Sequence, residues 1–224
     1  MSKFRRAIVS PILRGILGTI CRIDCREYLQ SLGGMEAMII AINHINFLEV
    51  PVVVAFSHPR QVTGLVQAQA WKNPVMGFLF DSYDAIPINR EGAYLQTFRK
   101  VHGMIREGFC VCIAPEGTRS KTGVLGRGKA GIVQLAYITG APVLPVAHYG
   151  GENFWRDLKK FKRTPFQMKV GRPFRFKFEG KPSRDVQEAM LTELMGRIAA
   201  LLPENMRGMY AEQALQESNY LEFI

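Results

Sequence analysis

The 224-residue sequence contains few cysteines and no long apolar run. A helix that crosses a bilayer needs roughly 18 to 20 consecutive apolar residues, and no uninterrupted stretch approaches that length. Cys21, Cys25, Cys110 and Cys112 have neither the spacing of a zinc knuckle nor the pattern of a secreted disulfide scaffold. We therefore expect a protein of a reducing compartment that does not span a membrane, with Cys110 and Cys112 packed on one face of a buried strand.

Two common catalytic signatures are also missing. There is no G-x-S-x-G nucleophile elbow and no G-x-x-x-x-G-K-[ST] phosphate loop, which argues against a serine esterase of the usual α/β type and against a P-loop NTPase. The segment 126–131 matches G-x-G-x-x-G, but it follows a polar turn and not a strand. We interpret it as a chance match and not as a dinucleotide fingerprint.

The composition is that of a folded globular protein with a basic surface. Hydrophobic residues make up 47% and charged residues 21%, which excludes a disordered chain, a collagen-like repeat and a coiled coil. The net charge is +10, so the expected partners are anionic: nucleic acid, phosphorylated metabolites or an acidic membrane. The basic residues are scattered and not interleaved with stacking aromatics, which makes nucleic acid the poorer candidate.

The amino-terminal segment 1–22 has a helical apolar stripe. Its apolar positions, spaced by four residues, are Phe4, Ile8, Ile12, Ile16 and Ile20, and its arginines lie mostly elsewhere. The pattern fits a helix that lies in a membrane interface, bent at a proline, and it fits equally well a helix packed on the domain with a solvated basic face.

Beyond this segment, apolar runs alternate with helical stretches. Strands are expected at 38–42, 62–65, 109–114 and 143–148, and helices at 50–56, 73–80, 95–107, 129–139 and 189–202. The segment 169–178, interrupted by Pro173, is expected to form an edge strand pair. The sequence therefore predicts a single α/β domain over 23–208, with a mixed, largely parallel sheet flanked by helices, an amphipathic interfacial segment over 1–22 and a carboxyl-terminal tail over 209–224.

The most informative stretch follows the first predicted strand. His44 and, five positions later, Glu49 lie in the turn after Ile42, where open α/β sheets place their sites. The two side chains can meet only if the backbone between them is not helical, and Pro51 indicates that regular helix begins near Glu49. An alternative is a capping box, with Asn46 as N-cap and Glu49 three residues later, and spacing alone does not separate the two interpretations.

Three further turns carry candidate binding residues. Arg90 ends one turn, and Glu116, Gly117, Thr118 and Arg119 form another; an arginine beside small or hydroxyl residues suits a bidentate grip on phosphate. Pro142, Val143 and Pro145 begin an apolar strand that either walls an acyl channel or belongs to the core.

In order and spacing, these four stretches resemble the glycerolipid acyltransferase family that contains the 1-acylglycerol-3-phosphate acyltransferases. Asn43 and His44 with Glu49 match its N-H-x4-D motif, with Glu in the place of the usual Asp. The segment 88–90 matches the second motif, the segment 116–120 matches E-G-T-R-S letter for letter, and the segment 141–145 matches the proline-rich fourth. The similarity extends from about residue 38 to residue 149.

This resemblance implies an enzyme that moves a fatty acyl group from acyl-CoA or acyl carrier protein to a lysophospholipid, giving phosphatidic acid if the acceptor is 1-acylglycerol 3-phosphate. It implies that His44 takes the hydroxyl proton, that Glu49 holds the other ring nitrogen, and that Arg90 and Arg119 hold phosphate. Neither a metal nor a bound cofactor is expected, and the protein is expected at the cytoplasmic face of a membrane as a peripheral protein. The alternative is a non-catalytic protein that binds anionic lipid or nucleic acid.

Overall fold

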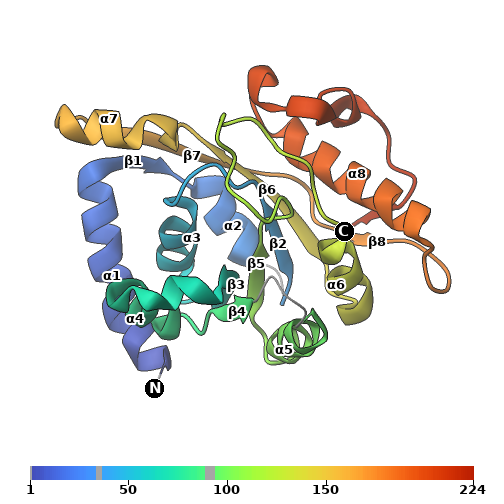
Figure 1. The fold of residues 1–224 in the computed structure, drawn as a ribbon, viewed down its shortest axis with the longest axis horizontal. Coiled ribbons are helices and arrows are strands. Elements are labelled where there is room, and N and C mark those ends of the chain that lie inside the picture. Colours follow the sequence, from blue (N-terminus) through green and yellow to red (C-terminus); the bar gives the residue numbers. More distant parts are fainter. Residues whose placement is uncertain (1, 34–36, 89–93) are drawn as a thin grey trace.

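The computed structural model describes residues 2–33, 37–88 and 94–224 and shows one α/β domain with three layers (Figure 1). The sheet strands are β1 (Cys21–Asp24), β2 (Ile39–Ile42), β3 (Val62–Gln67), β4 (Ile86–Ile88), β5 (Cys110–Ile113), β6 (Val143–Tyr149), β7 (Thr164–Val170), β8 (Phe174–Phe176) and β9 (Leu221–Phe223). Their order is β1-β7-β6-β2-β5-β3-β4, and β8 pairs with β6 and β9.

The sheet is mixed but mostly parallel, as the sequence predicts. β6, β2, β5, β3 and β4 run parallel, whereas β7 is antiparallel to β6 and parallel to β1. The edge pair expected at 169–178 is different in the structure: β7 begins at Thr164 and lies inside the sheet between β1 and β6. Pro173 separates β7 from β8, where a residue without an N–H group interrupts the hydrogen-bonded ladder least.

Helices cover both faces of the sheet. The structure describes α1 (Ser2–Ile20), α2 (Arg26–Gly33), α3 (Glu49–Ser57), α4 (Pro74–Ser82), α5 (Tyr94–Arg106), α6 (Gly131–Thr139), α7 (Phe154–Lys159) and α8 (Arg184–Ala200). One core cluster joins the sheet to α5, α6 and α8, and the other joins it to α1, α2 and α3. The helix predicted at 189–202 begins five residues earlier, at Arg184, because Ser183 caps it by accepting the N–H of Val186.

The central strands are buried on both faces, which explains their continuous apolar character. In β2, Ile39 contributes to the first core cluster and Ile40 to the second, because successive side chains point to opposite faces. Cys110 and Cys112 of β5 both face the second cluster, which confirms that they share one face of a strand. Burial raises the pKa of the Cys112 thiol to about 12, so this partly buried cysteine is a neutral thiol at pH 7.

Helix α1 carries apolar side chains on both faces: Leu13 and Leu17 pack against the second core cluster, where two arginines of the same helix also find partners. Arg6 is buried and binds Asp84 at 2.5 Å, and Arg14 donates to the carbonyl oxygens of Ala55 and His58 at the end of α3. The exposed face instead carries large apolar side chains: Phe4, Ile8, Ile12 and Ile16. The alternative of a packed helix with a solvated basic face is therefore wrong for these two arginines, since both face the protein.

The two ends of the described chain are integrated into the domain. Helix α1 packs on α3 and α4, and the segment 209–224 contributes β9 to the sheet and the buried Tyr210, whose hydroxyl accepts the N–H of Gly128. Both terminal segments thus contact the rest of the domain. No helix in the described ranges combines the length and apolar character that crossing a bilayer requires.

Candidate functional site

The candidate site lies where parallel strands end. His44 follows the carboxyl end of β2, and the turn 43–48 carries the chain to Glu49, the first residue of α3. The segment 114–120 follows the end of β5, which is the neighbour of β2. The sheet therefore brings the first and third sequence motifs to one edge, where open α/β sheets place their ligands.

His44 and Glu49 form a hydrogen-bonded pair. The Nδ1 atom of His44 contacts Oε1 of Glu49, and this is possible because the backbone between them forms bends and not helix. Glu49 is only 2% exposed, whereas the side chain of His44 is 24% exposed. The carboxylate thus fixes Nδ1 as the protonated ring nitrogen and leaves Nε2 available as an acceptor.

The second carboxylate oxygen of Glu49 has its own partners. Oε2 accepts the N–H of Asn46 at 3.2 Å and lies 3.0 Å from Nε2 of His148. The contact to Asn46 is one half of the capping box, but the Asn46 side chain accepts the N–H of Leu48 and does not cap α3. The capping box with Asn46 as N-cap is therefore not formed. Glu49 still makes two kinds of contact, because one oxygen holds the histidine while the other accepts the backbone N–H of the turn.

His148 is a member of the site that the sequence analysis does not single out. It lies in β6, is fully buried, and stacks on Phe166. Its Nε2 atom lies 3.0 Å from the carbonyl oxygen of Asn43 as well as from Glu49, and both partners only accept hydrogen bonds. Nε2 of His148 must therefore carry a hydrogen, which makes His148 a donor to the carboxylate. A polar residue at the end of a predicted buried strand was the available sequence signal.

Asn43 fixes the position of His148 in turn. Its side-chain amide donates to the carbonyl oxygen of His148 at 3.0 Å and accepts the N–H of the same residue at 2.8 Å. The result is a buried network in which β6 supports the turn between β2 and α3.

The network sets the charge of Glu49. Burial raises the pKa of this carboxyl, but the hydrogen bonds from His148 and His44 and their electrostatic attraction outweigh burial, so the pKa is lower than usual. Glu49 is therefore a carboxylate at neutral pH, as an orienting partner of a catalytic base needs to be.

Glu116 has a different place from the one its motif suggests. The sequence analysis groups it with the phosphate-binding residues, yet Oε1 accepts the N–H of His44 at 2.7 Å and Oε2 accepts the N–H of Gly126 at 2.7 Å. Burial raises the pKa of Glu116, although these two backbone hydrogen bonds partly offset the effect. Glu116 joins the third motif to the backbone of His44, and Gly126 belongs to this contact and not to a dinucleotide loop.

The next residues of the motif are exposed beside His44. Gly117, Thr118 and Arg119 lie on the surface, and the N–H of Ser120 donates to the carbonyl oxygen of His44 at 2.7 Å. A Cβ atom on Gly117 would lie 2.9 Å from Nζ of Lys129, and Gly117 has a φ of +68°. Lys129 thus adds a second cation to this turn, which sequence spacing does not reveal. Arg90 lies outside the described residues.

An apolar pocket opens beside the pair. It is lined by His44 and Glu49, by Val50 and Val53 of α3, by Leu65 of β3, and by Leu79 and Phe80 of α4. Pro142, Val143 and Pro145 do not belong to this lining: they are buried at the start of β6, and Val143 contributes to the core cluster beneath α5, α6 and α8.

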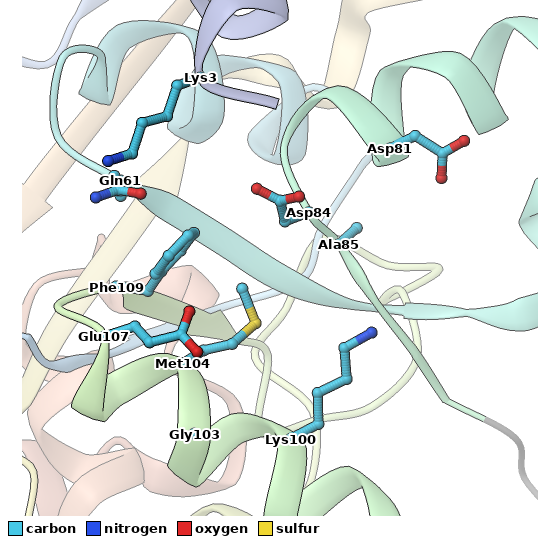
Figure 2. Close-up of a pocket in the computed structure, with 10 residues that line it drawn as sticks. All are labelled: Lys3, Gln61, Asp81, Asp84, Ala85, Lys100, Gly103, Met104, Glu107 and Phe109. Atoms are coloured by element: carbon cyan, nitrogen blue, oxygen red, sulfur yellow. The ribbon is translucent and has the colours of Figure 1, made fainter. Parts of the chain in front are cut away.

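A larger hollow of about 910 Å³ lies at the opposite edge of the sheet (Figure 2). Gln61 and Phe109 immediately precede β3 and β5, so this hollow lies at the amino ends of the strands. Figure 2 shows Lys100 and Asp84 reaching into it. It is separate from the site that contains His44.

Comparisons with known proteins identify the family of the chain. The Acyltransferase family model matches residues 22–149, more than half of the chain. The chain belongs to this family. The matched range contains both residues of the pair and the whole third motif. The family and the relatives below support an O-acyltransferase.

Individual relatives are distant. The 1-acyl-sn-glycerol-3-phosphate acyltransferase of Bacillus subtilis is 27% identical over 173 residues, which cover 77% of this chain and 84% of that protein. The Pseudomonas aeruginosa protein of the same name is 29% identical over 57% of the chain and 52% of its own length. The crystal structure of the LPA acyltransferase PlsC from Thermotoga maritima has a TM-score of 0.59 over 84% of this chain and 78% of that one, at 19% identity, and thus has the same fold.

Proposed function

We propose that this acyltransferase moves a fatty acyl group from a thioester, acyl-CoA or acyl carrier protein, to the free hydroxyl of 1-acylglycerol 3-phosphate and produces phosphatidic acid. The observation that carries the proposal is the hydrogen bond of His44 to the buried Glu49 carboxylate beside both an apolar pocket and two cations. Named relatives with the same activity support the choice of acceptor. The intact pair favours catalysis over a role as a non-catalytic binding protein.

In the proposed reaction, Nε2 of His44 accepts the proton of the acceptor hydroxyl as its oxygen attacks the thioester carbonyl. Glu49 stabilises the resulting imidazolium through Nδ1. The tetrahedral intermediate then collapses, the C–S bond breaks, and His44 returns the proton to the departing thiolate. Because a thioester is already activated, a positioned base worth about 10² to 10⁴-fold, together with proximity, suffices without an acyl-enzyme.

The surroundings suit the two ends of the substrates. Arg119 and Lys129 supply positive charge for the acceptor phosphate, and a guanidinium can bind it through two hydrogen bonds. The apolar pocket between α3, β3 and α4 has a volume of about 80 Å³, which suits the first methylene groups of an acyl chain whose carbonyl carbon lies near His44 and not the whole chain. We assign the acyl-binding walls to this pocket and not to Pro142, Val143 and Pro145.

The exposed apolar side chains of helix α1 support peripheral attachment to a membrane. Its exposed stripe of Phe4, Ile8, Ile12 and Ile16 has no partner among the described residues, and an apolar face of this kind binds at the headgroup boundary. The attachment rests on apolar area more than on charge, because Arg6 and Arg14 are occupied inside the protein. Both substrates carry acyl chains, so a site at the membrane surface can receive them directly.

The test is mass spectrometry of the lipids that the purified protein forms from mixed lysolipids with acyl-CoA or acyl carrier protein. We expect phosphatidic acid from 1-acylglycerol 3-phosphate, and no product with His44→Ala. The matched control is His102→Ala, a histidine of α5 that the site does not include. Absence of product with every donor and acceptor would contradict the proposal, and acylation of another lysolipid only would correct the acceptor.

A further inference from the structure

A second apolar surface lies on α7 and the turn that follows it. Trp155 is 64% exposed, Leu158 is 38% exposed, and Phe161 is fully exposed. A single exposed apolar side chain is common on protein surfaces. A cluster of them indicates a site of interaction with another protein or a membrane. We call Trp155, Leu158, Phe161 and the basic residues between them the α7 surface.

Phe161 is held outward by an unfavourable backbone conformation. Its φ is +52°, and it occupies the position after α7 where the N–H of Phe161 donates to Leu158 and the N–H of Lys162 donates to Asp157. Glycine is the usual residue at such a helix end because a side chain is strained there. A bulky aromatic side chain at this position lowers the stability of the folded protein. Because Phe161 is fully exposed, no packing within the protein offsets that loss. A role outside the protein explains both facts.

The α7 surface is strongly basic. The segment 154–163 carries five basic residues and one acid, a net charge of 5 − 1 = +4 of the +10 of the whole chain: Arg156, Lys159, Lys160, Lys162 and Arg163 against Asp157. Cations interspersed with aromatic and aliphatic side chains match the surface of an anionic bilayer, where charge attracts and apolar groups insert.

The α7 surface is connected to the catalytic turn and to α1. Phe47, which lies between His44 and Glu49 in the chain, stacks on Trp155 with ring centroids 5.4 Å apart and packs edge-on against Phe154. Arg163 donates to the carbonyl oxygens of Gly18 and Cys21, at the end of α1. Figure 1 shows α7 and the carboxyl end of α1 on the same side of the molecule.

We infer that the α7 surface inserts into the interface of an anionic phospholipid bilayer and thereby places the turn that carries His44 at the membrane. The inference goes beyond the attachment proposed for α1 and does not require it. An acidic protein, such as an acyl carrier protein, would satisfy the cations but would leave Phe161 and Leu158 without an apolar medium. A bilayer satisfies both.

The experiment uses the full chain with Trp71→Phe, which leaves Trp155 as the single tryptophan. We expect vesicles of phosphatidylcholine and phosphatidylglycerol to shift its emission to the blue and brominated lipids to quench it, with a much smaller response to pure phosphatidylcholine. Absence of both responses would overturn the inference. A blue shift of Trp155 emission with acyl carrier protein and none with vesicles would also overturn it.

Two variants separate the insertion from folding. Phe161→Gly removes the ring and relieves the backbone, so the Tm should stay or rise while vesicle affinity falls about tenfold. Lys159→Glu with Lys160→Glu should weaken binding to anionic vesicles by about tenfold or more and leave binding to neutral vesicles unchanged. Leu215→Ala, an exposed leucine outside the α7 surface, is the matched control and should change neither property.

An assay with a water-soluble short-chain acceptor separates the test of this inference from the test of the proposed function, because it measures activity without membrane binding. Phe161→Gly should retain that activity and lose activity only on acceptor embedded in vesicles. Unchanged vesicle affinity of Phe161→Gly and of the double lysine variant would show that α1 binds alone and would refute the role of α7. If the unsubstituted protein had no activity on the water-soluble acceptor, that result would instead count against the proposed function.

Discussion

Replacing Glu49 with glutamine tests the central element of the site. The two oxygens of Glu49 receive different donors: Nδ1–H of His44 on one side, and Nε2–H of His148 with the N–H of Asn46 on the other. A glutamine amide has one oxygen, so one side must meet an NH₂ group. The side with two donors will keep the oxygen, and the NH₂ group will then face His44.

The consequence for catalysis follows from the tautomer. An NH₂ group opposite Nδ1 of His44 forces that atom to accept, so the ring hydrogen moves to Nε2 and the base loses its acceptor atom. A positioned base contributes about 10² to 10⁴-fold, so kcat should fall by that factor, about 3 to 5 kcal/mol in activation free energy. KM should change little, because Glu49 is buried and lies behind the base.

The assay is the initial rate of thioester-dependent acylation against acceptor concentration, with Tm measured on the same samples. Glu107→Gln, at the opposite edge of the sheet, controls for the loss of a carboxylate and should retain full activity. The double variant with His44→Ala should be little worse than His44→Ala alone, since the two residues act together. A Glu49→Gln enzyme with normal kcat would refute the pair and leave the carboxylate as a stabiliser of the turn.

Three further predictions follow from contacts described above. Arg119→Ala should raise the KM for a phosphorylated acceptor about tenfold with kcat nearly constant, measured by initial rates; an unchanged KM would remove Arg119 from the site. Arg6→Ala should lower the free energy of unfolding by about 3 kcal/mol in urea titrations, because Asp84 and the buried carbonyl oxygen of Ser82 lose their donor. An unchanged unfolding midpoint would show that the ion pair of Arg6 and Asp84 does not contribute to stability. The folded pKa of Glu49 lies below its usual 4.5, so its stabilising contribution is present above pH 4.5 and is lost as the pH falls through the folded pKa. The stability difference between wild type and Glu49→Gln should therefore shrink as the pH falls below 4.5, and a constant difference would contradict the lowered pKa.

The parts of the site that the sequence predicts are those built from neighbouring residues. The turn from His44 to Glu49, the start of α3 near Pro51, and the exposed Arg119 all follow from local pattern and motif order. His148 does not, because it lies about 100 residues after Glu49 in the sequence and reaches it from β6, the strand beside β2. The pairing of these two strands produces no residue pattern that the sequence would show.

The orientation of α1 is another feature that the sequence alone does not predict. Periodicity identifies the apolar stripe but gives no direction for it, and burial of an apolar face is the ordinary expectation. The inner face of α1 is occupied by Leu13 and Leu17, which pack against the second core cluster. Arg6 and Arg14 also face inward and bind Asp84 and the carbonyl oxygens at the end of α3. Those partners become neighbours only in the folded protein.

The two hydrogen bonds of Glu116 have a consequence for genetic screens. Because this carboxylate holds the main chain of His44 and that of Gly126, a substitution at Glu116 moves the base without removing any group that reacts. In a saturation mutagenesis experiment, alleles of Glu116 should therefore group with alleles of His44, and suppressors should arise in the segment 124–128 more readily than among residues that hold phosphate. A screen that sorts positions by phenotype alone would count Glu116 as part of the chemistry, although its contribution is architectural.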